Sequence, residues 1–235
     1  MNEPNDQDAG GDIDFATVFA ANIHEIKNLL FLHFNAIENA SNEPWVLDNP
    51  EAQKSLSRIK YGSSRINQRL AHVLALYRIA QGRYELDIDY HDACEVLREI
   101  AVETHSLMED RGIDISIGSC EGLYGFFDRE MVRGILVNAV HNSLHYAKGK
   151  VLLSAEQEDG FLRFRVEDDS QGYPSEVLEH GGRRAKLDLC GGGTGLGLYF
   201  SATVAALHRN QGKSGFIQLS NEGALHGAVF SLYLP

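Results

Sequence analysis

The sequence has little of what several classes of protein depend on. It contains three cysteines in 235 residues, Cys94, Cys120 and Cys190, with no CxxC pair and no zinc-finger spacing to histidine. This excludes a disulfide-rich scaffold and a structural zinc site, and we expect reduced, packed thiols. No apolar run approaches the roughly 20 residues that a membrane-spanning helix needs, and no cationic, apolar leader is present. We therefore expect an unprocessed cytoplasmic protein without a membrane span.

Basic residues are also in the minority. The chain carries 21 Lys and Arg against 33 Asp and Glu, which gives a formal net charge of −12. A negative charge of this size repels nucleic acid and anionic lipid at long range, so we exclude a general nucleic-acid-binding function. A hydrophobic content of 43% over 235 residues is instead typical of one large globular domain or two small ones.

The first third of the chain has a heptad pattern. Residues 1–13 are polar and acidic and predict a flexible tail, but two later stretches repeat apolar side chains at alternating spacings of three and four. A loop with two prolines separates them, so they predict an antiparallel helical hairpin. The apolar positions are Phe19, Ile23, Ile26, Leu30 and Ile37, with His33 as a buried polar residue, and then Leu56, Ile59, Ser63, Ile66, Leu70, Val73, Tyr77 and Ala80.

Such a hairpin leaves a wide apolar stripe that another surface must cover. A second copy of the chain would cover it by completing a four-helix bundle, so we predict a homodimer. The alternative is that the stripe packs on the rest of the same chain.

Beyond Gly82 the chain has runs of strands with helices between them. Alternating patterns predict strands at YELDIDY, GIDISIG, KVLLSAEQ, FLRFRVED, GFIQLSN and GAVFSLYL. Helices are expected over residues 91–110, 128–147 and 195–208. Strands joined as hairpins rather than by regular βαβ crossovers predict an α+β sandwich, with one mixed sheet and helices on one of its faces.

The outward face of the first helix carries a histidine with polar neighbours. If Ile23 and Ile26 lie on the seam, His24 points to solvent, beside Glu25 and one turn before Asn28. A nucleophilic imidazole needs one free nitrogen while an acceptor holds the other as N–H, and Glu25 can be that acceptor. The alternative is an ordinary surface histidine.

The helix predicted over 128–147 has an unusual polar face. Asn138, Asn142, His145 and Tyr146 lie along it, although asparagine is a weak helix former. A hard cation such as Mg²⁺ would give such an asparagine a role, because this ion takes few protein ligands and completes its shell with water and phosphate. Two solvated asparagines are the alternative.

Two later segments are rich in turn residues. Asp168 ends a predicted buried strand before a turn at Gly172. Its carboxylate either accepts a hydrogen bond from an exocyclic amine of a ligand or only stabilises the turn. Residues 191–198 read GGGTGLGL and run into a helix, whose backbone N–H groups can converge on an anion. They fit neither the Walker nor the dinucleotide pattern. Arg183, Arg184 and Lys186 just before them are either a phosphate-covering lid or a solvated charge run.

Together these segments resemble bacterial two-component histidine kinases, in that family's order, over residues 14–235. The matching motifs are HEIKNLL (24–30), NAVHNSLHYA (138–147), DDSQGYP (168–174) and GTGLGL (193–198). The resemblance implies a dimerisation and histidine phosphotransfer hairpin over 14–82. It also implies a Bergerat-type ATP-binding domain, as in gyrase, Hsp90 and MutL, over 83–235.

The resemblance also implies a role for each matching residue. His24 corresponds to the phosphorylated histidine, Glu25 to its acidic partner and Asn28 to the amide that places a water for dephosphorylation. Asn142 corresponds to the Mg²⁺ ligand. The other implied ATP-binding residues are Asn138, His145 at the phosphates, Tyr146 on the adenine, Asp168 at the adenine amine, Gly172, Gly193, Thr194, Gly195, Leu196, Gly197 and Leu198.

What the resemblance implies for function is an ATP-dependent protein-histidine kinase. It would autophosphorylate His24 and pass the phosphoryl group to an aspartate of a separate response regulator, with a separate sensor protein supplying the signal. The alternatives are a phosphatase-dominant regulator, a related protein-serine kinase, or a non-catalytic adaptor that keeps the fold but uses its dimer and its ATP pocket to hold partners, so that the pocket no longer binds ATP. Two departures from the family pattern are Ser170, which stands where the family usually has a glycine, and the lack of a phenylalanine-rich motif before GTGLGL.

Overall fold

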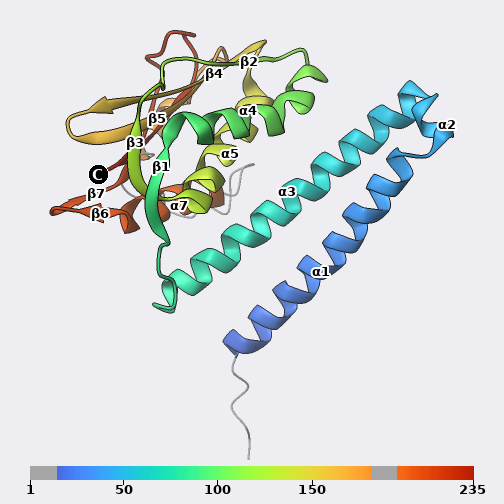
Figure 1. Cartoon of the computed structure of the whole chain (residues 1–235), viewed down its shortest axis with the longest axis horizontal. Coiled ribbons are helices and arrows are strands. Elements are labelled where there is room, and N and C mark those ends of the chain that lie inside the picture. The colour runs from blue at the N-terminus through green and yellow to red at the C-terminus, as the bar shows by residue number, and fades with distance from the viewer. Residues whose placement is uncertain (1–14, 181–194) are drawn as a thin grey trace, which may run out of the picture. The chain divides into compact units, whose positions relative to one another are not determined.

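A computed structural model of the chain describes residues 15–180 and 195–235 (Figure 1). The chain divides into two compact units, Met1–Leu74 and Ala75–Pro235. The tail predicted over residues 1–13 lies outside the described residues.

The described residues of the first unit, together with the helical residues up to Ala80, form the predicted helical hairpin. Helix α1 (Phe15–Ser41) and helix α3 (Pro50–Ala80) are joined through the short helix α2 (Pro44–Leu47). Asn49 caps the start of α3, since its Oδ1 accepts a hydrogen bond from the backbone N–H of Glu51 at 3.1 Å. None of the helices that the structure describes is long and apolar enough to cross a membrane.

The seam of the hairpin is only partly covered within one chain. Ile37 and Ser63 are buried, whereas Ile59 is 47% and Ile66 52% exposed. His33 is exposed as well, so the prediction that it is buried is wrong for the single chain. The reason is that two helices packed against each other can bury only one side of their apolar seam.

The second unit contains the predicted mixed sheet, with strand order β2-β4-β5-β9-β8. Strand β2 runs parallel to β4, and the other neighbouring pairs are antiparallel. Asp159 and Gly160 take positive φ values of 52° and 75° in the turn between β4 and β5, as a tight hairpin requires. The strands are β2 (Asp114–Ile117), β4 (Lys150–Glu158), β5 (Phe161–Asp168), β8 (Phe216–Ser220) and β9 (Val229–Leu234).

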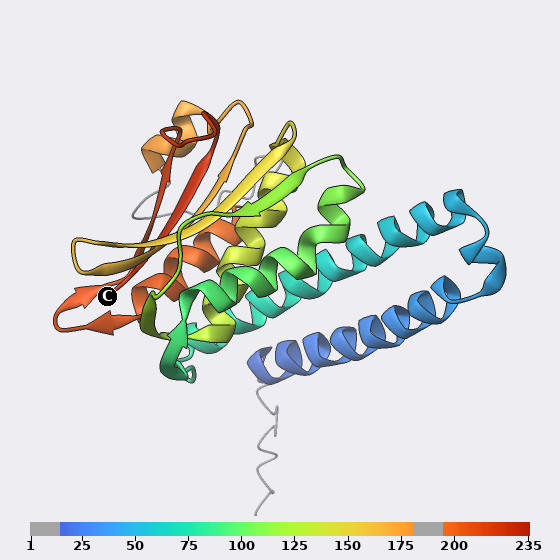
Figure 2. The same ribbon diagram turned by 45° about the horizontal axis from the view of Figure 1, so that its top comes forward.

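Three helices cover one face of this sheet (Figure 2). They are α4 (Ala93–Glu109), α5 (Arg129–Tyr146) and α7 (Leu196–Leu207), close to the predicted ranges. The alternation of β5 explains the layering, because Phe164 and Val166 are buried while Arg165 between them is on the opposite face. Burying each large apolar side chain in this core contributes roughly 1.5–3 kcal/mol.

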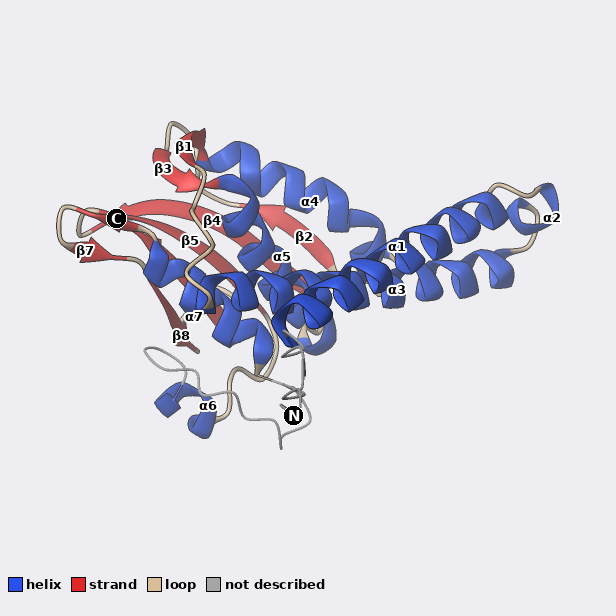
Figure 3. Cartoon of the chain, turned by 90° about the horizontal axis from the view of Figure 1, so that it is seen from below, coloured by secondary structure: helices blue, strands red, loops and turns tan. Residues whose placement is uncertain are grey.

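The sequence patterns missed several short elements. Strand β3 (Tyr124–Asp128) pairs with β1 (Ile88–Asp92) as a separate two-stranded ribbon (Figure 3). Gly125 weakens the strand signal of β3, but a Cβ there would lie 2.8 Å from Leu162, so the glycine allows close packing. Also missed were helix α6 (Ser175–His180) and the short strands β6 (Arg209–Asn210) and β7 (Lys213–Ser214).

The prediction of reduced thiols is wrong for two of the three cysteines. Cys94 in the first turn of α4 and Cys120 just before β3 form a disulfide, with their Cα atoms 5.0 Å apart. Both residues are buried. Their separation of 26 residues along the chain gives no pattern, and only the packing of α4 beside the β2–β3 connection brings them together. Cys190 lies outside the described residues.

Candidate functional site

Helix α5 presents the predicted polar face at one side of the second unit. The Asp128 side chain caps this helix by accepting from the backbone N–H of Met131 at 2.9 Å. Asn142 is half-buried, and its amide makes no hydrogen bond within the described part of the chain. Tyr146 at the end of the helix is 73% exposed, so most of its surface is open to a ligand.

Helix α7 meets this polar face at Gly197. A Cβ on Gly197 would lie 2.5 Å from Nδ2 and 2.6 Å from Oδ1 of Asn138, so the glycine leaves the space that the Asn138 amide occupies. The Asn138 Nδ2 is buried and has no hydrogen-bond partner among the described residues. A buried donor without a partner indicates an acceptor that the protein itself does not supply, either a ligand or water.

The start of α7 has the backbone expected for an anion-binding loop. Gly195 takes the left-handed conformation, with φ 56°, immediately before the first helical residue. The first backbone N–H groups of a helix have no partner within the helix, so those at Leu196 and Leu198 are available to a ligand. Gly193 and Thr194, like the cationic residues Arg183, Arg184 and Lys186, lie outside the described residues.

Asp168 occupies the end of β5 and is 4% exposed. Its Oδ1 accepts from the backbone N–H groups of Ser170 at 3.0 Å and Ala228 at 3.3 Å. Its Oδ2 makes no hydrogen bond to any residue that the structure describes. One oxygen is therefore fixed by the backbone, and the other is available to an amine donor.

The turn after Asp168 forms in spite of the unusual Ser170. The buried Ser170 hydroxyl accepts from the backbone N–H of Gly172 at 3.0 Å. Gly172 has φ 84°, and a Cβ there would collide with the Asn221 side chain. Asn221 in turn accepts from the Tyr173 N–H at 2.7 Å and donates to its carbonyl at 3.0 Å. The serine thus stabilises the turn by supplying an internal hydrogen-bond acceptor.

Burial affects the pKa values of two residues near Asp168. Burial and the charge of Asp168 raise the pKa of Tyr173, so this phenol stays protonated. Burial alone would raise the pKa of Asp169, but backbone hydrogen bonds lower it overall. Those from Lys148 at 2.8 Å and Gly149 at 3.1 Å go to Asp169 Oδ1, which ties the end of α5 to the end of β5.

The second unit thus joins the predicted motifs through α5. Its middle contacts the start of α7 through Asn138 and Gly197, and its end is held beside the Asp168 turn through Asp169. No cluster of three or more His, Cys, Asp or Glu among the described residues could hold a metal ion. The free amide of Asn142 is consistent with a cation that takes few protein ligands, as Mg²⁺ does.

The sequence predicted a strand beginning at Gly227 but did not indicate that this segment supports Asp168. Ala228 donates to its carboxylate, and a Cβ on Gly227 would collide with the backbone of Asp168 and Ser170. Two glycines, Gly223 and Gly227, mark the close approach of this segment in the sequence.

In the first unit, the predicted phosphotransfer residues lie on α1. The backbone of His24 is helical, and its side chain lies outside the described part of the structure. Glu25 and Asn28 are both exposed.

Comparison with known proteins finds similarity to histidine kinases. Residues 127–235 match the model of the histidine kinase-, DNA gyrase B-, and HSP90-like ATPases. The chain is 31% identical over 160 residues to the sensor protein kinase CarS of Pseudomonas aeruginosa, and 24% identical over 197 residues to the signal transduction histidine-protein kinase AfsQ2 of Streptomyces coelicolor. The chain is therefore similar to sensor histidine kinases, and its residues 127–235 match the ATPase part that they share with DNA gyrase B and HSP90. The alignments cover 66% and 80% of this chain and 34% of each relative, so the chain spans about a third of their length.

Solved histidine kinases share the fold. The structure of the Acinetobacter baumannii histidine kinase AdeS has a TM-score of 0.57 at 18% identity, covering 90% of this chain and 96% of that one. The catalytic domain of histidine kinase ThkA has a TM-score of 0.55 at 22% identity, covering 64% of this chain and 98% of that one. The chain therefore has the fold of these solved structures, a helical region followed by an α/β unit of the type found in histidine kinase catalytic domains.

Proposed function

We propose that this chain is an ATP-dependent protein-histidine kinase that autophosphorylates on His24. The observation that carries the proposal is the Asp168 carboxylate, buried at the end of β5 with one oxygen fixed by backbone N–H groups and the other free. Such an acceptor suits the exocyclic amine of adenine, and the exposed ring of Tyr146 would pack on the base. In this proposal residues 83–235 form the ATP-binding domain.

The phosphates would lie between α5 and the start of α7. The N–H groups of Gly195–Leu198 and the buried donor of Asn138 are available to phosphate oxygens, and His145 lies at the same end of α5. Asn142 would hold Mg²⁺, which supplies charge neutralisation on the phosphates when bound. Gly172, Gly193 and Thr194 complete the proposed binding residues.

Residues 14–82 form the dimerisation and phosphotransfer hairpin in this proposal. A nitrogen of the His24 imidazole attacks the γ-phosphorus, so that an N–P bond forms and the bond to the bridging oxygen breaks, releasing ADP. Glu25 takes the imidazole proton. The phosphoryl group then passes from nitrogen to a carboxylate oxygen of an aspartate on a separate response regulator, and Asn28 can position water for its later removal.

A second copy of the chain is the proposed cover for the hairpin. Apolar side chains of α1 are exposed in the single chain, with Leu29 at 59% and Leu32 at 64%. Together with Ile59 and Ile66 they leave a surface that a four-helix bundle would bury. A separate sensor protein is the proposed source of the signal.

The proposal is tested with γ-labelled ATP and Mg²⁺. We expect acid-labile label on the wild-type chain, none on His24→Gln, and undiminished label on His33→Gln, the matched control on the same helix. Label that persists in His24→Gln contradicts the assignment, and acid-stable label would favour the protein-serine kinase. Lack of binding of an ATP analogue to the wild type would favour the non-catalytic adaptor.

A further inference from the structure

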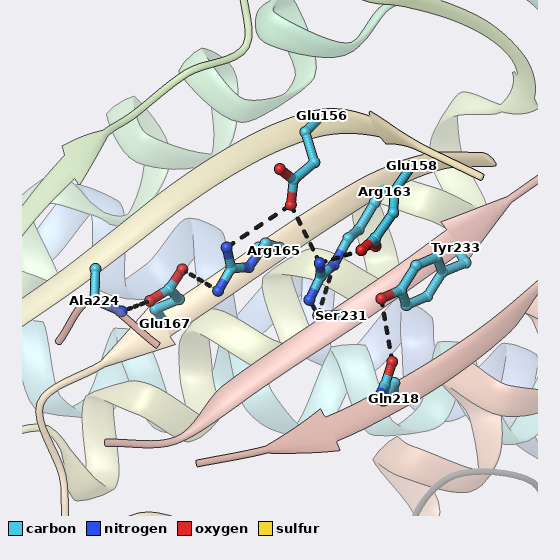
Figure 4. Close-up of polar contacts among 9 residues, drawn as sticks. All are labelled: Glu156, Glu158, Arg163, Arg165, Glu167, Gln218, Ala224, Ser231 and Tyr233. Atoms are coloured by element: carbon cyan, nitrogen blue, oxygen red, sulfur yellow. Dashed lines mark hydrogen bonds and ion pairs between the residues drawn. The ribbon is translucent and has the colours of Figure 1, made fainter. Parts of the chain in front are cut away.

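A buried ion pair stands directly behind the proposed adenine site. Glu167 precedes Asp168 on β5, and its side chain is 2% exposed on the sheet face away from the helices (Figure 4). Its Oε1 lies 2.7 Å from Nη2 of Arg165. Its Oε2 accepts from the backbone N–H of Ala224 at 2.8 Å.

The other ion pairs on this face have a different character. Arg163 contacts Glu156 at 3.2 Å and Glu158 at 2.9 Å, and those two carboxylates are 46% and 41% exposed. Exposed pairs of this kind contribute little to stability. Glu167 is the carboxylate that loses nearly all of its hydration, and Arg165 Nε is buried with no partner among the described residues. Burial this costly suggests a role in fixing geometry rather than in net stability.

The geometry that Glu167 fixes is that of segment 221–228. A Cβ on Gly223 would collide with the Glu167 carboxylate, so the backbone of this segment lies directly against it. Four residues after Ala224, the Ala228 N–H donates a hydrogen bond to Asp168 Oδ1, and the Ala228 carbonyl accepts one from the Asp168 N–H at 3.0 Å. The segment therefore joins Glu167 to the orientation of the Asp168 carboxylate.

We propose that Glu167 is a positioning residue for adenine recognition, acting through Arg165, Ala224 and segment 221–228 on Asp168. The inference rests on the proposed function, because it takes Asp168 as the acceptor of the adenine amine. Loss of the Glu167 charge should therefore weaken the discrimination between nucleotide bases in a protein that still folds.

The test compares the dissociation constants of ADP and IDP, which differ in the group that faces Asp168. In the wild type, ADP should bind more tightly, because the carbonyl of IDP repels a carboxylate. Glu167→Gln should reduce this preference by about tenfold, since a hydrogen bond to a charged group loses its alignment. Glu158→Gln, on the same face but with no contact to segment 221–228, should keep the wild-type preference.

The outcomes separate the two proposals. If the wild type binds neither nucleotide or shows no preference, the proposed role of Asp168 fails, and this inference fails with it. If the wild type discriminates and a folded Glu167→Gln does so equally, only the inference is overturned.

A second variant covers the case in which Glu167→Gln does not fold. Arg165→Met combined with Glu167→Leu replaces the ion pair by apolar side chains, which such sites often tolerate. It removes the anchor of Ala224 and should show the same loss of preference. A folded double variant that keeps the full preference for ADP would overturn the inference, because the ion pair would then have no effect on Asp168. Failure of both variants to fold would also overturn it, because the ion pair would then act on the stability of the whole domain.

Discussion

The two units of this chain differ in how they complete their apolar surfaces. In the second unit, Phe127, Phe164 and Leu232 are fully buried by elements of the same unit. In the hairpin, Phe31 is 66% and Leu32 64% exposed. The second unit therefore buries a core of its own, whereas the hairpin leaves large apolar side chains of its helices exposed in the single chain.

The same contrast holds for the proposed chemical groups. Asp168 and Asn138 are held by contacts between distant segments, so their positions depend on the whole second unit. Glu25 and Asn28 are exposed positions on one helix. We expect substitutions in the hairpin to act through association, and those in the second unit through geometry.

The largest expected effect is on the hairpin. Ile59→Glu combined with Ile66→Glu should convert a dimer into a monomer, because each isoleucine gains roughly 1.5–3 kcal/mol on burial and a charge reverses that gain. Sedimentation equilibrium measures the mass. Phe126→Glu, which changes an exposed aromatic of the second unit, should leave the mass unchanged. A wild-type chain that is already monomeric would contradict the comparison.

Next in size is the disulfide of the second unit. Reduction, or Cys94→Ala with Cys120→Ala, should lower the free energy of unfolding by about 3 kcal/mol, since the bond restricts the unfolded chain. Denaturant unfolding with and without reductant measures the change. Cys190→Ala is the control. An equal midpoint under both conditions would show that the bond contributes nothing.

The second unit should also lose stability in acid through His208. Its Nε2 accepts from the Asp128 N–H at 3.1 Å while Nδ1 donates to the Val204 carbonyl at 3.0 Å, so the buried ring is neutral. Burial lowers the pKa of His208, although Val204 and Asp128 oppose the shift.

Protonation therefore favours the unfolded chain. Above pH 6.5 the His208 ring is neutral in both the folded and the unfolded chain, so it does not make the free energy of unfolding depend on pH. As the pH falls below 6.5 towards its folded pKa, the free energy of unfolding should decrease by up to about 1.4 kcal/mol per pH unit. His208→Gln, which does not titrate, should flatten the profile between pH 7 and 5 in denaturant titrations. Parallel profiles for the two proteins would contradict this.

A smaller effect is expected where α5 meets α7. Gly197→Ala should displace the Asn138 amide and cost about 1 kcal/mol of nucleotide affinity, with less effect on unfolding. Calorimetric binding of ADP measures it. Gly62→Ala, where an added Cβ meets nothing within 4 Å, is the control on the hairpin. Equal affinity in Gly197→Ala would show that Asn138 does not contact the ligand.

The smallest effect concerns the turn after Asp168. Ser170→Ala removes the acceptor of the Gly172 N–H and should cost about 1 kcal/mol of stability. Thermal unfolding measures this loss. Ser175→Ala, at the start of α6, serves as the comparison. An unchanged melting temperature would mean that the turn does not need the serine.

Whether a feature could be predicted from the sequence depends on how far apart along the chain its interacting residues lie. The long helices and paired strands were predicted because their periodicity is local, whereas β3 was missed because Gly125 hides its pattern. Asp168 and Asn138 could be selected from the sequence, but Ala228 and Glu167 could not, because their roles come from contacts across 57 or more positions.

The sequence by itself determined the helical hairpin, the mixed sheet and the order of the four motifs, since each follows from side-chain spacing within a short segment. Only the tertiary structure decided that Cys94 meets Cys120, that Gly197 makes room for Asn138, and that segment 221–228 supports Asp168. The physical reason is that packing brings together groups whose separation along the chain carries no periodic signal.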